Sequence, residues 1–255
     1  GIVEENDGMI LFNFRPDRVR ELFKVFTNSS FDSFERKFIP NLKLVTMMPV
    51  SDEVIYTSAF NHISLENILG PYLSKLGFNQ LRIAETEKYA HVTYFFDGGK
   101  EMELDGCERI LIPSPKVATY DLKPEMSAYK ITDTLLSELD KKIHDVVILN
   151  YANGDMLGHT GNMDATIESL EFLDECVHKI YDKVMELGGT LIVTADHGNC
   201  ELMIDENNEV VTSHTTNKVP FVVCNKDINL NDGKLSDIAP TILEILNINK
   251  PEEMS

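Results

Sequence analysis

From Pro71 to the end of the chain, short apolar runs alternate with longer amphipathic segments, and this alternation restricts the fold more than any other feature. Strands and helices that alternate in this way build a layered α/β domain with a largely parallel sheet. The expected strands are HVTYFF (91–96), DVVILNY (145–151), TLIVTA (190–195) and VPFVVC (219–224). We therefore predict an α/β fold for this part of the chain.

Three amphipathic segments predict helices between or after these strands. In SAYKITDTLLSELDKK (127–142), Ile131, Leu135 and Leu139 recur on one helical face. SDIAPTILEIL (236–246) predicts a late helix. A long helix is expected to begin at Met163 and to end before the glycines at 188 and 189. Its predicted buried stripe consists of Ile167, Leu170, Leu173, Val177, Ile180, Val184 and Leu187.

The first sixty residues follow a different pattern, which indicates a separate domain. GMILFNF (8–14) and NLKLVTMMPV (41–50) are typical of strands, and RPDRVRELFKVF (15–26) is typical of a basic helix. We place the domain boundary near Asn61, so that residues 1–61 and 62–255 form two domains.

A fresh helix is expected directly after this boundary. It would run from Leu65 to Leu76, with Ser64 as its N-cap and Gly77 just past its end.

Composition excludes several classes of partner. The chain has 23 Lys plus Arg against 42 Asp plus Glu, and the formal net charge of −19 disfavours binding to nucleic acid or to anionic membranes. We find neither a signal-peptide pattern nor an apolar stretch of the roughly 18 residues that span a bilayer. The four cysteines form no CxxC pair, which argues against a zinc knuckle and a disulfide framework. A globular, soluble, cytoplasmic protein is expected.

Two of the apolar runs end in an aspartate and a histidine. Asp155 and His159 follow one predicted strand, and Asp196 and His197 follow another. Functional side chains of an open α/β sheet gather where strands end. Carboxylates and imidazoles without cysteine suit Mn²⁺ or Zn²⁺. With His214 from the loop before the last strand, Asp155 and His159 could form one metal site, and Asp196 and His197 could begin a second.

Each of these residues also has a structural interpretation when taken alone. An aspartate after a strand often caps a helix, and a single histidine often lies in the core or on the surface. His62, His91, His144 and His178 have no such neighbours in the sequence, and His178, near the apolar face of the long helix, is expected to be structural.

Two metal ions a few ångströms apart often clamp a phosphoryl group, so the pattern favours phosphoryl chemistry. Such chemistry in an acidic protein needs local cations. Arg15 and Arg18 lie where a strand meets a helix, and arginine can hold an oxyanion with two parallel hydrogen bonds. Lys88 is a third candidate. The structural alternatives are a solvated helix face for Arg18 and an ion pair with neighbouring acids for Lys88.

Six blocks of sequence, taken in order, resemble the cofactor-independent phosphoglycerate mutases of the alkaline phosphatase superfamily. They are FNFRPDR, RIAETEKYAHVTYFF, SPKVATYDLKPEMSAY, ILNYANGDMLGHTGN, TADHGN and SHTTNKVP, and the resemblance runs over essentially the whole chain. The resemblance implies a two-domain enzyme that interconverts 3-phosphoglycerate and 2-phosphoglycerate through a phosphoserine intermediate. It also implies two metal ions, which are Mn²⁺ in most bacterial members.

All eight candidate residues fall on these motifs. The resemblance implies that Asp155, His159 and His214 bind one metal ion, that Asp196 and His197 supply two ligands of the other, that Arg15 and Arg18 grip the substrate, and that Lys88 lies between the two sites.

The chain differs from full-length members of that family, in which the phosphatase-like domain is split. There, the first strand, an aspartate ligand and the nucleophilic serine precede an inserted transferase domain. The resemblance thus implies that residues 1–61 are the tail of the transferase domain and residues 62–255 most of the phosphatase-like domain. Ser114, Ser127 and Ser213 occupy positions that the family does not use for attack. Our hypothesis is that this chain is inactive alone and that its partner is the missing N-terminal half.

Two alternatives remain at this point. A metal-dependent phosphatase or phosphopentomutase of the same superfamily would share the Asp/His core, although FNFRPDR is not expected in it. The chain could also be a metal-binding half that works only by complementation with another polypeptide.

Overall fold

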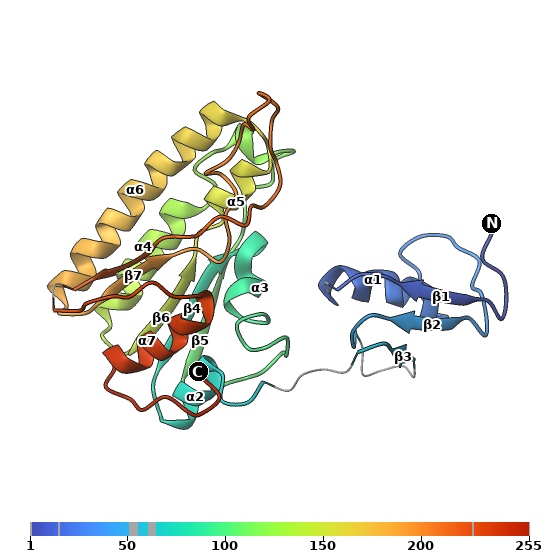
Figure 1. The fold of residues 1–255 in the computed structure, drawn as a ribbon, viewed down its shortest axis with the longest axis horizontal. Coiled ribbons are helices and arrows are strands. Elements are labelled where there is room, and N and C mark those ends of the chain that lie inside the picture. The colour runs from blue at the N-terminus through green and yellow to red at the C-terminus, as the bar shows by residue number, and fades with distance from the viewer. Residues whose placement is uncertain (1, 15, 51–55, 61–64, 226, 255) are drawn as a thin grey trace. The chain divides into compact units, whose positions relative to one another are not determined.

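The computed structural model describes residues 2–14, 16–50, 56–60, 65–225 and 227–254. The chain divides into two compact units, Gly1–Leu65 and Glu66–Ser255 (Figure 1). Asn61, where we predicted the boundary, lies outside the described residues. In the described part of the chain, no helix combines the length and the apolar character that crossing a membrane requires.

The first unit holds a small parallel sheet and one helix. In chain order its elements are β1 (Gly8–Leu11), α1 (Pro16–Thr27), β2 (Lys43–Thr46) and β3 (Thr57–Ser58). The sheet order is β1-β2-β3, with both pairs parallel. Val19 and Phe23 of α1 pack against Leu44 of β2, which builds a separate small core. The two predicted strands are confirmed in shorter form, and the predicted helix is confirmed with a shift of one residue.

The second unit holds the larger share of the secondary structure. Its helices are α2 (Leu69–Lys75), α3 (Tyr89–Val92), α4 (Ala128–Asp140), α5 (Asn153–Gly158), α6 (Met163–Glu186) and α7 (Ile238–Ile245). Its strands are β4 (Gln80–Glu85), β5 (Cys107–Ile112), β6 (Val146–Asn150), β7 (Leu191–Thr194) and β8 (Phe221–Cys224). The helices predicted from 127, 163 and 236 are confirmed as α4, α6 and α7.

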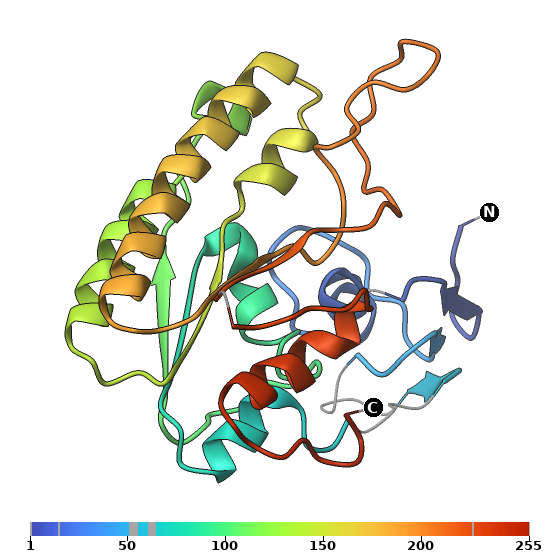
Figure 2. The same ribbon diagram turned by 60° about the vertical axis from the view of Figure 1, so that its left-hand side comes forward.

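A three-stranded parallel sheet in the order β5-β4-β6 forms the centre of this unit. On one face, Leu81 and Ile83 of β4 pack with residues of α4 and α6. On the other face, Val146 packs with Leu73 of α2 and Leu243 of α7. Figures 1 and 2 show these helices on opposite sides of the sheet. The predicted layered α/β class with largely parallel strands is therefore confirmed.

The last two strands form an antiparallel pair of their own. Thr194 at the end of β7 lies opposite Phe221 at the start of β8. The chain returns between them through the segment 195–220, where no crossover helix occurs among the described residues, and a parallel connection would need such a crossover. This pairing brings the segment before β8 to the edge where β7 ends.

The strand predicted at 91–96 is wrong. The strand in this region is β4, and the segment 91–96 continues α3 into turns, with the Thr93 hydroxyl donating to the Tyr89 carbonyl one helical turn earlier. A short apolar run does not distinguish a strand from a buried helical turn. β4 escaped prediction because it carries Gln80, Arg82 and Glu85, all of which are buried.

The helix after the boundary begins later than predicted. α2 begins at Leu69 rather than Leu65, because Asn67 has a positive φ of 51°, which a right-handed helix does not allow. The predicted N-cap, Ser64, lies outside the described residues. The predicted end is confirmed, since Gly77 adopts a φ of 83° directly after the helix.

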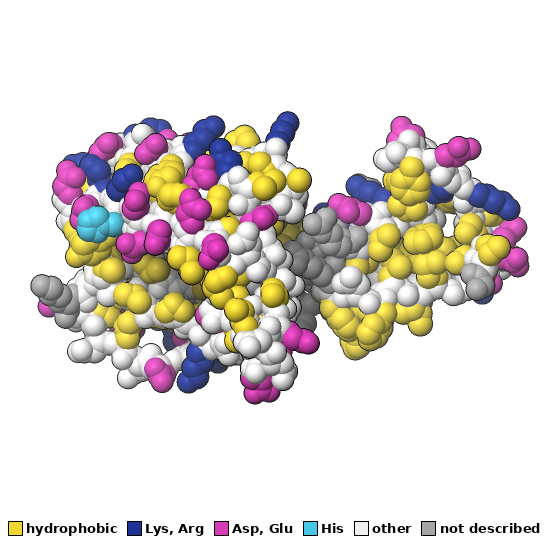
Figure 3. All heavy atoms as spheres, turned by 90° about the horizontal axis from the view of Figure 1, so that it is seen from above, with side chains coloured by type: hydrophobic (Ala, Val, Ile, Leu, Met, Phe, Trp, Pro, Cys, Tyr) yellow, Lys and Arg dark blue, Asp and Glu magenta, His cyan; other side chains and the backbone are white. Residues whose placement is uncertain are grey.

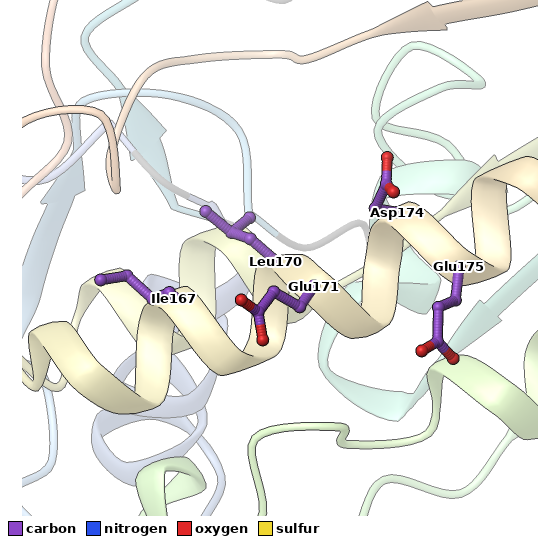
Figure 4. Close-up of a pocket in the computed structure, with 5 residues that line it drawn as sticks. All are labelled: Ile167, Leu170, Glu171, Asp174 and Glu175. Carbon is purple, nitrogen blue, oxygen red and sulfur yellow. The ribbon is translucent and has the colours of Figure 1, made fainter.

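The buried stripe of α6 is wrong in its first half. Ile167 and Leu170 are exposed, and with Glu171, Asp174 and Glu175 they line an open hollow of about 580 Å³ (Figure 4). The helix instead buries smaller side chains there, including Ala165, Thr166 and Ser169. His178 is exposed as well, 3.5 Å from Asp182. The face of α6 that packs against the rest of the unit is therefore not its most apolar face, which is partly exposed.

The surface of the larger unit matches the acidic composition. Figure 3 shows Asp and Glu side chains scattered among exposed hydrophobic ones over the face in view. The hollow along α6 carries three carboxylates and no histidine among the residues that line it, so it differs in chemistry from the predicted metal site.

Candidate metal centre

The strand topology brings the predicted site residues of the second unit to one edge of the sheet. β4 and β6 are parallel and end side by side, with Ala84 opposite Asn150. Lys88 follows β4 in a 3₁₀ turn, and Asp155 follows β6 within α5. Both side chains therefore arrive at the carboxyl edge, where α/β proteins place their functional groups.

Three donor atoms converge at this edge. Asp155 Oδ1 lies 3.1 Å from His159 Nε2 and 2.9 Å from His214 Nε2, and the two Nε2 atoms are 3.1 Å apart. A tetrahedral ion about 2.1 Å from each ligand spaces the ligand atoms about 3.4 Å apart. One carboxylate and two imidazoles at this spacing fit a divalent cation such as Zn²⁺ or Mn²⁺.

A hydrogen bond outside the three donors sets the orientation of His159. Its Nδ1 lies 2.7 Å from the carbonyl oxygen of Thr212, which can only accept, so Nδ1 carries a proton and donates. In the neutral ring this leaves the lone pair on Nε2, facing Asp155 and His214. Metal-binding histidines ordinarily have such a carbonyl or carboxylate partner on the second nitrogen.

Asp155 stays ionised in spite of its position. Burial on its own raises the pKa of the carboxyl, but hydrogen bonds from Lys88 and Asn199 and the charges of Lys88 and His159 outweigh burial and hold the pKa well below its usual range. Lys88 Nζ donates to Oδ2, and Asn199 Nδ2 donates to Oδ1 at 2.6 Å. The carboxylate therefore carries the negative charge that suits a metal ligand at neutral pH.

His214 is held in its neutral form. Burial lowers the pKa of its imidazole, and the neighbouring His197 and His159 lower it further, against the opposing charge of Asp155. A neutral imidazole is the form that binds a metal.

Asp196 and His197 lie beside this group without joining it. The His197 ring stacks on the His214 ring with centroids 3.8 Å apart, and its Nε2 is 3.7 Å from Asp196 Oδ2. Among the described residues, neither belongs to a group of three convergent donors. Their carboxylate and imidazole are thus an adjacent pair of potential ligands.

The two predicted substrate arginines belong to the first unit. Arg15 lies outside the described residues, and Arg18 is in the first turn of α1. Their expected role in gripping substrate stays a prediction.

Two polar residues of the site were missed by sequence reasoning. Asn199 is 95 % buried and also donates to the Asp155 carbonyl at 3.1 Å. Glu201 accepts from the Asn199 backbone at 2.6 Å. Asn199 stood inside the TADHGN block, but nothing in the pattern marked Glu201.

A second group of donors was also missed. Glu108, Glu138 and His144 converge at the start of β5 and just before β6, which is the amino edge of the same sheet. His144 Nε2 lies 3.4 Å from Glu138 and 3.6 Å from Glu108. Lys141 pairs with Glu138 at 2.6 Å. Sequence reasoning found no neighbours for His144, because its partners, Glu138 in α4 and Glu108 in β5, come from other elements.

Comparison with known proteins places this site in a family. The Metalloenzyme superfamily matches residues 24–250, so the chain belongs to that superfamily.

Its curated relatives include 2,3-bisphosphoglycerate-independent phosphoglycerate mutases. Those of Acaryochloris marina, Clostridioides difficile and Acetivibrio thermocellus are 50%, 52% and 53% identical over 100%, 100% and 99% of this chain. The matched part is 50%, 51% and 50% of their respective lengths, so the chain spans about half of each relative.

A solved structure has the same fold. The phosphoglycerate mutase of Leishmania mexicana, crystallised at low cobalt concentration, is 30% identical with a TM-score of 0.84. The match covers 100% of this chain and 51% of that one. The resemblance inferred from the six sequence blocks is confirmed at the level of family.

Proposed function

We propose that the protein to which these residues belong interconverts 3-phosphoglycerate and 2-phosphoglycerate through a phosphoserine intermediate, using two divalent ions, with Mn²⁺ as the proposed metal. The observation that carries this proposal is the convergence of Asp155, His159 and His214 beside Lys88, in a chain about 50% identical to phosphoglycerate mutases. These three residues are the ligands of one ion.

The chain's own groups have distinct tasks in this proposal. A bound divalent ion supplies positive charge that stabilises the phosphoryl group during transfer. Lys88 neutralises one oxygen of Asp155 and leaves the other toward the two imidazoles. Its ammonium also offers hydrogen-bond donors to phosphate oxygens at the same edge. Arg15 and Arg18 hold the remaining phosphate or carboxylate oxygens of the substrate.

The second ion is bound by Asp196 and His197 together with residues outside this chain. Two observations support this division: the pair has no third convergent donor among the described residues, and the chain spans about half the length of its relatives. The nucleophilic serine comes from the other half, and residues 1–61 and 62–255 are parts of the transferase and phosphatase-like domains. The protein acts in the cytoplasm in glycolysis, on a small-molecule substrate.

In a second candidate function, the chain has the same metal site but does not catalyse a reaction by itself. The chain would act as a metal-binding half that works by complementation with a separate polypeptide, and its half-length match to the mutases favours this version too. A mutase assay of the 255-residue chain distinguishes both versions from an autonomous enzyme. Turnover near that of a full-length mutase would contradict the need for a second half.

The metal site is tested by titrating the chain with Mn²⁺ in a calorimeter. We expect one tight site, and we expect His214→Ala to weaken it by more than about 100-fold, because losing a ligand exceeds the 10–100-fold cost of losing an outer partner. His144→Gln is the matched control, since it removes an imidazole from the amino-edge group and should leave the affinity unchanged. Equal losses in both variants, or none in His214→Ala, would contradict the assigned ligands.

A further inference from the structure

Glu201 connects two loops of the segment between β7 and β8, each of which carries one predicted histidine ligand. One loop follows β7 and contains His197; the other precedes β8 and contains His214. Oε2 of Glu201 accepts from the Asn199 backbone at 2.6 Å, within the first loop. Oε1 accepts from the Thr215 hydroxyl and from Asn217 Nδ2, at 3.0 Å for the latter, both in the second loop. Each carboxylate oxygen is thus committed to a different loop.

The backbones of the two loops also meet at this point. Gly198 and Thr215 form an antiparallel bridge, with the Thr215 amide donating to the Gly198 carbonyl at 2.9 Å. A Cβ atom on Gly198 would lie 2.2 Å from the Thr215 hydroxyl and 2.4 Å from Glu201 Oε1. Only glycine permits this approach, so the backbone itself is shaped around the Glu201 contacts.

The same connection reaches Asp155 through Asn199. The backbone amide of Asn199 donates to Glu201. Its side-chain amide donates to Asp155 Oδ1 at 2.6 Å and to the Asp155 carbonyl at 3.1 Å. The side-chain amide of Asn199 fits against α5 because Gly158 has no side chain. A Cβ atom at this position would lie 2.3 Å from Asn199 Oδ1. A continuous chain of hydrogen bonds therefore joins Asp155, Asn199, Glu201 and the residue next to His214.

Packing alone does not account for this arrangement. Glu201 is exposed, so its position follows from its hydrogen bonds and not from burial in a core. Carboxylate hydrogen bonds are strong and directional, and partners outside a metal's own ligands commonly fix the geometry of those ligands.

We propose that Glu201 is a positioning residue for the metal centre, which holds the loop of His214 against Asn199 and Asp155 at the spacing that a divalent ion requires. This inference rests on the proposed metal site. Glu201 does not itself bind the ion; it acts through Asn199 on one side and Thr215 on the other.

The test is a Mn²⁺ titration of the 255-residue chain, its Glu201→Ala variant and a Glu206→Ala control. Glu206 is an exposed carboxylate in the turn between the same two loops, so the control makes the same change of charge. We expect Glu201→Ala to weaken Mn²⁺ binding by about 10–100-fold and Glu206→Ala to leave it unchanged. The visible absorption of Co²⁺-loaded protein should also shift in Glu201→Ala, because the ligand geometry changes.

Failure of the inference and failure of the proposed site give different results. Tight binding by the unaltered chain with equal affinity and an equal Co²⁺ spectrum in Glu201→Ala would overturn the role of Glu201 alone. No binding by the unaltered chain would overturn the metal site and this inference with it. Should Glu201→Ala not fold, Thr215→Val decides, since it removes one donor to the same carboxylate: a weaker site supports the inference, and an unchanged one overturns it.

Discussion

Each edge of the central sheet carries a group of carboxylates and imidazoles with a lysine, but the two groups differ in the spacing of their donor atoms and in the burial of the lysine. At the carboxyl edge, Asp155 meets two imidazoles with donor atoms 2.9–3.1 Å apart, and at the amino edge His144 lies 3.4 and 3.6 Å from its two glutamates. Each edge has a lysine on one carboxylate. Lys88 is only 8 % exposed in its side chain, whereas Lys141 is 50 % exposed.

We infer from this difference that partners outside the three donors distinguish the candidate metal site from a local ion-pair cluster. At the carboxyl edge, Thr212 fixes the tautomer of His159, and Lys88 takes the Asp155 oxygen that the imidazoles leave. At the amino edge, Lys141 contacts both oxygens of Glu138, at 2.6 and 2.7 Å, and occupies the carboxylate that a cation would need. Donors converge at both edges, but the partners that surround them differ.

The largest expected effect comes from removing the two lysines in turn. Lys88→Met leaves the Asp155 carboxylate partly buried without its cation, and we expect a loss of about 3 kcal/mol in the free energy of unfolding, because breaking a buried pair costs about 3–5 kcal/mol and Asn199 still donates. Lys141→Met should lose much less, since solvent screens its exposed pair. Urea unfolding in EDTA measures both. Equal losses of unfolding free energy in the two variants would mean that burial does not set the strength of these ion pairs.

A smaller effect is expected from two glycines of the same short helix. A Cβ on Gly158 would lie 2.3 Å from Asn199 Oδ1, so Gly158→Ala displaces Asn199 from Asp155 and should cost about 1–3 kcal/mol as overpacking does. The nearest atom to a Cβ on Gly154 is Cys200 Sγ at 3.6 Å, an ordinary contact. Gly154→Ala should therefore be neutral or stabilising by up to about 1 kcal/mol. Thermal melting of both variants checks this, and a destabilised Gly154→Ala would contradict it.

The smallest expected effect is a difference in pH dependence between one glutamate from each edge. Burial raises the pKa of Glu85 at the end of β4, with hydrogen bonds from Ser114 and Ser127 opposing it. The hydrogen bond from Lys141 lowers the pKa of Glu138. The raised pKa of Glu85 therefore stabilises the folded protein at pH values below the pKa of this group in the unfolded chain. This stabilisation is lost as pH rises through the pKa of the folded state. Glu138 contributes stability above its unfolded pKa that is lost as pH falls.

The two Gln variants separate these contributions. Glu85→Gln should flatten the loss of stability as pH rises above about 4.5, and Glu138→Gln should flatten the loss as pH falls below about 4.5. Urea midpoints measured across pH 3–8 in EDTA test the sign. Curves that stay parallel to that of the unaltered chain would show that neither carboxyl has a shifted pKa.

Secondary structure was predictable where side-chain periodicity and packing agree. Ile131 and Leu135 of α4 are both buried, as their spacing indicated. The agreement fails at β4, whose Arg82 is 1 % exposed because its guanidinium lies over the Phe96 ring, 4.0 Å from the centroid, and donates to Gln80. A sequence pattern treats such residues as exposed, since it does not show the Phe96 ring that covers the guanidinium.

The sequence by itself determined the α/β class, the strand ends that carry Asp155, His159, Asp196 and His197, and the family. These properties follow from local periodicity and from sequence motifs that contain the candidate metal ligands. Only the tertiary structure decided that the donor atoms of Asp155, His159 and His214 converge, that Glu201 and Asn199 connect the surrounding loops, and that a second cluster forms around His144. Several of these contacts join residues far apart in the sequence: Glu201 and Thr215 are 14 positions apart, Asn199 and Asp155 are 44 apart, and His159 and His214 are 55 apart. Strand pairing and loop packing, which no local pattern encodes, bring them together.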